Sequence, residues 1–492
     1  MICGTGSDVG KSHVVTGLCR LLARKGVRVT PFKGQNMALN SAVTPSGHEI
    51  GRAQAVQAWA AGAEPEPAMN PILLKPTGER TSQVIVMGRP LAHLEAVAYQ
   101  AAKSRLFDTV LDALAHLRRR YDVVVLEGAG SAAEINLLDA DLVNLRLAAA
   151  AGGIPAVVVG DIDRGGVFAA LYGTVALLPD RLRPLVRGFV VNKLRGDPAL
   201  LAGAAAELEA RCGVPTLGVL PYLADVGLDA EDSLALARGL PRPACPIGAP
   251  AAGGLDVAAV RFPRISNFTD LDPLALEPGV GVRLVEHAAA LGRPDLIVLP
   301  GTKATVSDLE WLRATGLDRA VAAADAVVLG ICGGYQMMGR HIVDEVESGR
   351  GDVEGLGWLP AETVFAPDKV TRSRSGSACG QPVAGYRIAQ GRVTGDGAWI
   401  DLDDGWGAEA DGASADRGRV LGTTLHGLFE SDGFRAAFLA EVARRRGRVF
   451  TAGEVSFAAA RRAQADRLAD TLEAHLDLAA LEELVEEGAM RQ

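Results

Sequence analysis

The sequence predicts an α/β fold along the whole chain, beginning with a doubly wound parallel sheet and continuing into a second α/β domain. Short runs of Val, Ile and Leu recur, each ending in Gly, Pro, Asp, Asn or Glu, which is typical of buried parallel strands. Ala- and Leu-rich segments with helical spacing lie between these runs. This alternation favours α/β architecture, since parallel strands need crossover helices. The strand-like runs are 123–126, 156–159, 186–191, 295–299 and 326–329, and the helix-like segments are 13–25, 93–119 and 199–211.

A Pro- and Gly-dense stretch over 237–254 divides the chain, because it has neither strand nor helix period. We expect a first domain over 1–236, this linker, a second domain over 255–445 and a helical extension over 446–492. The extension is rich in Ala, Leu and Glu with alternating charges, which predicts surface helices or, as an alternative, an oligomer contact. Gly-, Asp- and Ser-rich segments at 366–382 and 403–418 are expected to be long surface loops.

Composition excludes several classes of protein. The 492 residues carry a net charge of −9 and no Lys/Arg-rich tract, which argues against a general nucleic-acid partner. The six cysteines form no CxxC pair, so neither a zinc site nor a disulfide framework is indicated. Because the N-terminus lacks an apolar signal region and the apolar runs are broken by Gly and Pro, we expect a cytoplasmic protein without membrane contact. The oligomeric state is left open.

The segment GTGSDVGKS, residues 4–12, has the glycines, lysine and hydroxyl of a phosphate-binding loop ahead of a helical stretch. Its spacing is one residue longer than the common GxxxxGK[ST], and this variant resembles the dethiobiotin synthetase branch of P-loop proteins. Lys11 is expected to contact the β- and γ-phosphates of ATP, and Ser12 a Mg²⁺ ion. Only three residues precede the loop, so we expect the natural chain to begin upstream. The candidate ATP-binding residues in the loop are Thr5, Gly6, Ser7, Asp8, Val9, Gly10, Lys11 and Ser12.

Polar residues close the later strands of the first domain. Glu127 follows an apolar run at the position where P-loop enzymes place an acidic residue for the metal, so it is the second Mg²⁺ candidate; a helix-capping or solvent-facing carboxylate is the alternative. The segment DIDRGG, residues 161–166, brings two carboxylates and an arginine to the same sheet edge, unless they form only surface ion pairs. Asn192 is a weaker candidate for reading the nucleotide base.

The segment AVVLGICGGYQMMG, residues 326–339, predicts a strand, a sharp turn and a helix, with Cys332 at the turn. Such a nucleophile elbow leaves backbone amides free for an oxyanion, and the helix N-terminus lowers the thiol pKa. His426 follows a later strand and is the candidate base. Gly301, Gly333 and Gln336 are assigned to the oxyanion hole and glutamine pocket.

Glutamine amidotransferases with a catalytic triad carry Glu two positions after the histidine, and Leu428 stands there. Glu430 lies two residues further on and is the alternative candidate for the residue that orients the histidine. We nevertheless expect a Cys332–His426 pair without a third member.

The two sites together predict amide formation. A thiol attacking the side-chain amide of glutamine releases ammonia, and ATP activates a carboxylate as an acyl phosphate that ammonia attacks. Because ammonia that protonates in water cannot attack, we expect a shielded route between the domains.

Ten segments resemble the cobyric acid synthase family in order and spacing. This resemblance implies a dethiobiotin synthetase-like P-loop domain followed by a flavodoxin-like class I glutamine amidotransferase domain. It also implies ATP-dependent amidation of the b, d, e and g carboxylates of adenosylcobyrinic acid a,c-diamide, a corrinoid, to give adenosylcobyric acid in cobalamin biosynthesis. The segments are GTGSDVGKS, FKGQNMALNS, EIGRAQAVQA, MNPILLKP, EGAGSAAEINL, DIDRGGVFA, RISNFTDLDPL, LPGTKATVSDLEWL, GICGGYQMMG and TTLHGLF.

The amide-rich segment FKGQNMALNS supplies the candidate acceptor pocket, although a loop that merely caps the sheet is an open alternative. Its candidates are Lys33, Gln35, Asn36 and Asn40. The segment GYRIAQG departs from the family pattern at Arg387 and Ala389, which places substrate contacts there in doubt.

Two rival functions remain open. One is cobyrinic acid a,c-diamide synthase, which uses the same chemistries on other carboxylates; RISNFTD and KGQNMALNS favour the first family. The other is a P-loop ATPase switch with a vestigial amidotransferase module, against which the retention of Lys11, Cys332 and His426 argues.

Overall fold

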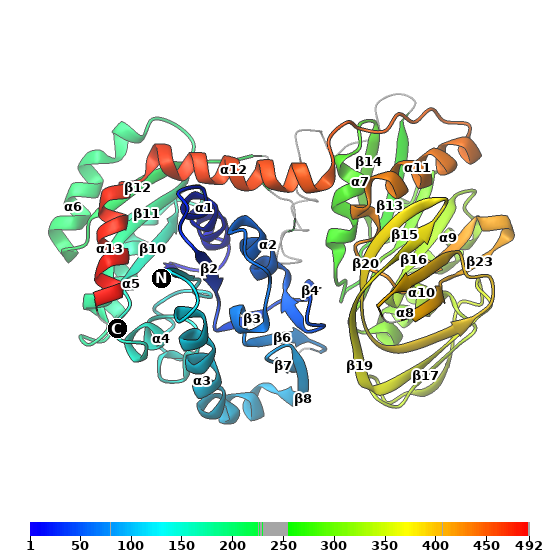
Figure 1. Cartoon of the computed structure of the whole chain (residues 1–492), viewed down its shortest axis with the longest axis horizontal. Coiled ribbons are helices and arrows are strands. Elements are labelled where there is room, and N and C mark those ends of the chain that lie inside the picture. Colours follow the sequence, from blue (N-terminus) through cyan, green and yellow to red (C-terminus); the bar gives the residue numbers. More distant parts are fainter. Residues whose placement is uncertain (79, 225, 227–228, 230–253, 406, 491–492) are drawn as a thin grey trace.

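The computed structural model describes residues 1–490 apart from 79, 225, 227–228, 230–253 and 406, and it contains two α/β halves side by side (Figure 1). The expected linker therefore lies outside the described residues except for its last residue, 254. We call the two parts the phosphate-loop half and the thiol half. The C-terminal helix α12 (Phe457–His475) begins at the thiol half, where the N–H of Phe457 binds Asp432, and runs across to the phosphate-loop half, where it packs along α1 (Lys11–Arg24). Helix α13 (Leu478–Met490) lies on the phosphate-loop half.

The phosphate-loop half is built on parallel strands in the order β2-β9-β1-β10-β11-β12, in which a parallel bridge between Ile2 and Glu127 joins β9 to β1. Val157 and Val159 of β10 face α1 and α12, whereas Ala156 and Val158 face the opposite apolar layer, because side chains alternate along a strand. The strands are β1 (Ile2–Gly4), β2 (Val29–Phe32), β9 (Val123–Leu126), β10 (Ala156–Asp161), β11 (Val186–Leu194) and β12 (Thr216–Pro221). The other helices are α2 (Arg52–Ala60), α3 (Ala96–Arg118), α4 (Leu145–Ala150), α5 (Val167–Leu177) and α6 (Ala202–Cys212).

Two small sheets, which lie between β2 and α3 in the sequence, extend the phosphate-loop half toward the thiol half (Figure 1). One is a hairpin of β4 (Ser41–Val43) and β5 (Glu49–Gly51). The other has the order β3-β6-β7-β8, formed by β3 (Gln35–Met37), β6 (Ile72–Pro76), β7 (Thr81–Val86) and β8 (Arg89–Glu95).

The thiol half has a sheet in the order β14-β13-β15-β16-β24-β23, parallel except for its last strand. Its buried apolar side chains form one cluster with the flanking helices. The strands are β13 (Leu255–Val260), β14 (Val280–Val285), β15 (Leu296–Leu299), β16 (Val327–Ile331), β23 (Ala413–Ala415) and β24 (Val420–Thr423). The helices are α7 (Asp272–Leu276), α8 (Thr305–Ala314), α9 (Leu317–Ala323), α10 (Gly333–Met338) and α11 (Asp432–Arg446).

A second sheet in the thiol half corrects one expectation from the sequence. Residues 366–378, expected to be a surface loop, belong to the long strand β19 (Ala361–Ala378), which pairs antiparallel with β20 (Gln381–Gly395). Most of 403–418 is also strand. The remaining strands of this sheet are β17 (His341–Asp344), β18 (Gly351–Glu354), β21 (Ile400–Asp404) and β22 (Gly407–Asp411).

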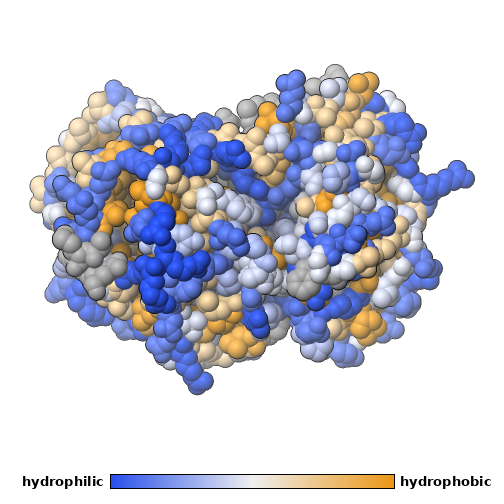
Figure 2. Space-filling model, viewed as in Figure 1, coloured by the Kyte–Doolittle hydropathy of each residue, from blue (hydrophilic) through white to orange (hydrophobic). Residues whose placement is uncertain are grey.

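Hydrophilic residues predominate on the face shown in Figure 2, and hydrophobic ones are scattered among them. Within the described part of the chain, every helix is too short or too polar to cross a membrane.

Candidate active sites

The phosphate loop lies between β1 and α1, and its shape depends on Gly10, whose φ is +102°. A side chain there would also collide with Asn192, because a Cβ would lie 2.1 Å from its Nδ2. Lys11 curls back over the loop, and its Nζ donates to the carbonyl oxygens of Gly6 at 2.7 Å and Gly130 at 3.1 Å. The ammonium is thus positioned beside a loop of backbone amides at a helix N-terminus, the arrangement that binds phosphate.

The strand end after β9 brings Glu127 to this loop. Ser12 Oγ donates to Glu127 Oε1 at 2.9 Å, and Lys33 Nζ and Gln57 Nε2 contact the same carboxylate at 3.0 and 2.5 Å. Burial alone would raise the pKa of Glu127, but these partners, Lys33 foremost, hold that pKa below its usual range. The carboxylate is therefore an anion. Hard oxygen donors such as this hydroxyl and carboxylate suit Mg²⁺, which usually takes its remaining ligands from water and phosphate.

A cavity of about 1420 Å³ opens beside the loop. Lys11, Ser12 and Glu127 line it together with Lys33, Gln35 and Asn36 from the segment FKGQNMALNS. The structure thus brings three of the four candidate acceptor residues to the same cavity as the phosphate loop, with Lys33 bound to Glu127.

Asn40, the fourth candidate, lies elsewhere. Its Oδ1 accepts a hydrogen bond from the backbone N–H of Phe268, in the thiol half, at 3.3 Å. The side chain is 1% exposed and is absent from the residues that line the cavity.

Asn192, at the end of β11, braces the phosphate loop. Its Nδ2 donates to the carbonyl oxygen of Val9 at 2.8 Å, and its Oδ1 accepts from the N–H of Lys193. Lys193 Nζ in turn contacts Asp161 Oδ2 at 2.8 Å and the carbonyl oxygen of Asp8 at 2.5 Å. Asp161, the last residue of β10, is therefore tied to the loop through Lys193.

The thiol half carries a nucleophile elbow at Cys332, between β16 and α10. Cys332 has φ +50° and ψ −108°, a conformation that costs energy for a residue with a side chain and is characteristic of functional turns. The helix lies so close to the sheet that a Cβ at Gly334 would be 1.9 Å from the carbonyl oxygen of Leu299. Cys332 as a whole residue is 8% exposed and sits at the N-terminus of α10.

His426 follows β24, and its imidazole interacts electrostatically with the thiol of Cys332. Burial alone would raise the pKa of Cys332, but the charge and hydrogen bond of His426 and the N–H of Gly333 lower it. Burial would lower the pKa of His426, but Asp270 and Cys332 raise it to about 10. The pair is therefore a thiolate and an imidazolium, the reactive form of a cysteine nucleophile.

The expectation that Cys332 and His426 form a pair without a third residue was wrong, because a carboxylate contacts the far nitrogen of the imidazole. Asp270 Oδ2 lies 2.7 Å from His426 Nδ1, and its Oδ1 accepts from the N–H of Gly427 at 2.7 Å. Glu430 is bound elsewhere, since it forms ion pairs with Arg52 at 2.7 Å and Arg461 at 3.2 Å. Asp270 lies 156 residues before the histidine, so no local spacing in the sequence could have identified it.

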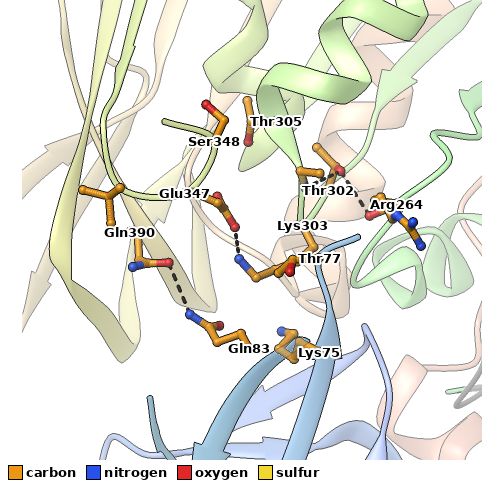
Figure 3. A network of polar contacts seen from close by, with 12 residues as sticks. Lys75, Thr77, Gln83, Arg264, Thr302, Lys303, Thr305, Glu347, Ser348 and Gln390 are labelled. Carbon is orange, nitrogen blue, oxygen red and sulfur yellow. Dashed lines mark hydrogen bonds and ion pairs between the residues drawn. The ribbon is translucent and has the colours of Figure 1, made fainter. Parts of the chain in front are cut away.

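The loop after β15 lies against His426 and against Gly333, the residue that follows Cys332. A Cβ at Gly301 would lie 2.8 Å from His426 Cε1, and a Cβ at Gly333 would lie 2.9 Å from the backbone nitrogen of Thr302. Figure 3 shows the next residue, Lys303, pointing toward Glu347, with which it forms an ion pair. Gly301 and Gly333 are thus adjacent to the thiol site, and their role in an oxyanion hole stays a prediction.

Gln336 is buried in α10. Its Oε1 accepts from Thr305 Oγ1 at 3.0 Å, and its Nε2 lies against Gly391 of β20. In this structure its amide joins α10 to α8 and β20.

The two residues that depart from the family pattern lie on β20. Arg387 binds Thr424 Oγ1 at 2.8 Å and Asp411 at 3.0 Å, which ties β20 to the strand before His426. Ala389 is buried and follows Ile388, whose carbonyl oxygen lies 3.9 Å from Cys332 Sγ.

Two family models match the two halves of the chain. Residues 1–235 match the family described as CobQ/CobB/MinD/ParA nucleotide binding domain, and residues 256–434 match the CobB/CobQ-like glutamine amidotransferase domain. The cobyric acid synthase of Rhodococcus jostii is 54% identical over 99% of this chain and 96% of its own length. That of Nocardia farcinica is 52% identical over 99% and 97%. A solved glutamine amidotransferase structure covers 38% of this chain and 98% of its own at 16% identity and a TM-score of 0.30.

Proposed function

This chain belongs to the cobyric acid synthase family and is an ATP-dependent, glutamine-hydrolysing ligase of cobalamin biosynthesis, and from this premise we propose how its residues divide the reaction. The acceptor is adenosylcobyrinic acid a,c-diamide, whose b, d, e and g carboxylates become amides. Its corrin ring carries several carboxylates, which the positive charges and amide side chains of the cavity suit. The reaction takes place in the cytoplasm.

Cys332 and His426 release ammonia from glutamine. The thiolate attacks the side-chain carbonyl, the N–H groups near Gly301 and Gly333 stabilise the oxyanion, and the imidazolium protonates the departing ammonia. A γ-glutamyl thioester remains on the sulfur. Water activated by the now neutral His426 hydrolyses it, which gives glutamate and restores the thiolate and imidazolium.

The phosphate-loop half activates the acceptor. A corrinoid carboxylate oxygen attacks the γ-phosphorus of ATP, so that ADP leaves and an acyl phosphate forms. Lys11 stabilises the charge on the transferring phosphoryl group. Ser12 and Glu127 would hold Mg²⁺, which neutralises charge on the β- and γ-phosphate oxygens when bound. Ammonia then attacks the acyl carbon, phosphate leaves, and a proton is lost to give the amide.

The ammonia travels between the two halves. The interface between the halves includes buried contacts, such as that of Gln83 on β7 with Gln390 on β20 at 3.3 Å (Figure 3). A buried interface would exclude the water that protonates ammonia.

The observation that carries this division of roles is the buried Cys332–His426–Asp270 arrangement in one half and the Lys11–Ser12–Glu127 arrangement in the other. Cys332→Ala should abolish glutamine hydrolysis and glutamine-dependent amidation but keep amidation driven by concentrated ammonium. Lys11→Met should lose amidation from either nitrogen source while glutamine hydrolysis persists.

Both activities are measured on the same preparations, by glutamate release and by mass spectrometry of the corrinoid. Unchanged glutamine hydrolysis in Cys332→Ala would overturn the assignment of the nucleophile.

A further inference from the structure

The loop between β13 and α7 connects the thiol site to the other half of the molecule. The N–H of Ser41, at the start of β4, donates to Asn267 Oδ1 at 2.9 Å. In return, Asn40 Oδ1 accepts from the N–H of Phe268 at 3.3 Å. Asn40 and Asn267 are 1% and 2% exposed, so both hydrogen bonds are shielded from water.

The same loop holds the catalytic histidine. Asp270 lies three residues after Asn267, in a single turn of 3₁₀ helix over Phe268–Leu271, and it binds both His426 Nδ1 and the N–H of Gly427. Asn267 has φ +51°, a left-handed conformation that asparagine tolerates, and it turns the chain into this helix. Because one short turn carries both contacts, a displacement at Asn267 reaches Asp270 directly.

A second side chain joins Ser41 to His426 from the opposite direction. Tyr386 on β20 donates its hydroxyl to the carbonyl oxygen of Ser41 at 3.2 Å. Its ring stacks on the imidazole at 5.5 Å between centroids and 28° between planes, and the two residues exchange backbone hydrogen bonds at 2.8 and 2.9 Å. Ser41 is therefore held through its N–H and its carbonyl by two residues on either side of the histidine.

Ser41 is itself part of the segment that reaches the nucleotide cavity. Gln35 and Asn36 line that cavity, and β4 begins five residues after Asn36. The segment is anchored at its end because Arg52, the first residue of α2, donates its N–H to the carbonyl oxygen of Asn40 at 3.2 Å. The guanidinium of Arg52 also binds Glu430, four residues beyond His426.

We propose that Asn267 is a positioning residue through which the phosphate-loop half orients Asp270 against His426, so that glutamine hydrolysis depends on the docking of the two halves. This inference rests on the proposed role of Cys332 and His426. The route runs from the cavity along FKGQNMALNS to Ser41, and from there to the histidine through Asn267 and Asp270. Tyr386 links Ser41 to His426 from the opposite direction.

The test uses Asn267→Gly in the full chain, because glycine keeps the left-handed backbone and removes only the side-chain acceptor. The readout is the pH dependence of Cys332 alkylation by iodoacetamide, followed by mass spectrometry of the peptide that contains it. A looser Asp270 stabilises the imidazolium less, so the midpoint for thiolate formation should rise. We expect the midpoint to rise by about one pH unit. At pH values below the midpoint, kcat for glutamine hydrolysis should fall about tenfold, and KM should change little.

The charged and titratable groups around the imidazole are Asp270 in the 3₁₀ turn, Cys332 at the elbow and Tyr386 on β20, with Arg52 and Glu430 beyond them. Tyr386→Phe is the second variant, since it keeps the stacked ring and removes only the hydroxyl that binds Ser41. It should shift the midpoint in the same direction. Ser414→Ala, which removes an exposed hydroxyl bonded to Gly397, is the matched control and should shift nothing.

Ammonium-driven amidation at the wild-type rate in each variant establishes that the fold and the phosphate-loop half are intact. If Asn267→Gly and Tyr386→Phe both keep the wild-type midpoint and kcat, the positioning role is wrong even though Cys332→Ala still abolishes hydrolysis. If Cys332→Ala hydrolyses glutamine normally, the proposed function itself fails, and the two failures are thus distinguishable.

Discussion

His426 is held as a cation between two anions, Asp270 and the thiolate of Cys332. The interaction lowers the pKa of the thiol and raises that of the imidazole to about 10, although burial opposes both charges. The mutual stabilisation exists only while both groups are charged. The reactive form is therefore present above the lowered pKa of Cys332 and is lost as the pH rises through the pKa of His426.

The pH profile of glutamine hydrolysis follows from these directions. Activity should fall on the acid side at a pH below the usual range of a thiol, as Cys332 becomes protonated, and should persist on the alkaline side to about pH 10. The measurement is kcat/KM for glutamine across pH, with ammonium-driven amidation as the reference. An alkaline limb near the ordinary pKa of histidine would contradict the charged pair.

Asp270→Asn tests the third residue directly. Asparagine preserves the size of the side chain but removes the charge, and the analogous change in a serine protease triad costs about 10⁴-fold in kcat. We expect a loss of about 10² to 10⁴-fold in glutamine hydrolysis with ammonium-driven amidation retained. A residual rate near that of wild type would show that His426 needs no charged partner.

The residues that could be predicted from the sequence are those whose roles depend on neighbours along the chain. Lys11 and Cys332 sit in loops whose glycines and following helices identify them locally. Asp270 and Asn40 act across the fold, one against His426 and one against the thiol half, and no periodicity records such a contact.

Among the elements, the short helix α10 depends on its close fit to β15. In Gly334→Ala, the new Cβ would lie 1.9 Å from the carbonyl oxygen of Leu299, so the helix must move away from the sheet and take Cys332 with it. We expect destabilisation of about 1–3 kcal/mol and loss of glutamine hydrolysis, measured by thermal melting and glutamate release.

Gly173→Ala is the matched control, because nothing lies within 4 Å of a Cβ at this position in α5. It should be neutral or stabilise the fold by up to about 1 kcal/mol, since alanine favours a helix interior. Equal melting temperatures for Gly334→Ala and wild type would contradict the close fit.

The ribbon of β19 and β20 shows where element prediction failed. Its sequence includes TRSRSGS, in which small and charged residues weaken the strand signal. The strand is held by its partners, for example by the ion pair of Arg374 with Asp404 at 2.7 Å across to β21. Five of the parallel strands were predicted correctly, because continuous apolar runs such as 156–159 reflect burial on both faces.

At the scale of the whole molecule, α12 completes the phosphate-loop half. Leu472 is 2% exposed and packs with Val15 and Cys19 of α1. Leu472→Ala should destabilise this half by about 2–5 kcal/mol through the lost contacts and the cavity left behind. We expect ammonium-driven amidation to be lost at a lower temperature than in wild type, whereas Val485→Ala on α13, 40% exposed, should change little.

The chemistry and the acceptor were predicted from different kinds of information. The phosphate loop and the nucleophile elbow indicate amide formation on physical grounds, but only the resemblance over the whole length indicated a corrinoid. Relatives that are 50–54% identical over 99% of the chain carry the name cobyric acid synthase, which decides against both rival functions.

The chain leaves the phosphate-loop half, builds the thiol half and then returns to cover α1 with α12 (Figure 1). During synthesis on the ribosome, the apolar side of α1 therefore stays uncovered until the last segment of the polypeptide has been made. A gene cut between the two halves would separate α1 from its cover. Fission of this enzyme into two freely expressed subunits would require the terminal helices to move with the first gene, or a circular permutation that places them ahead of β1.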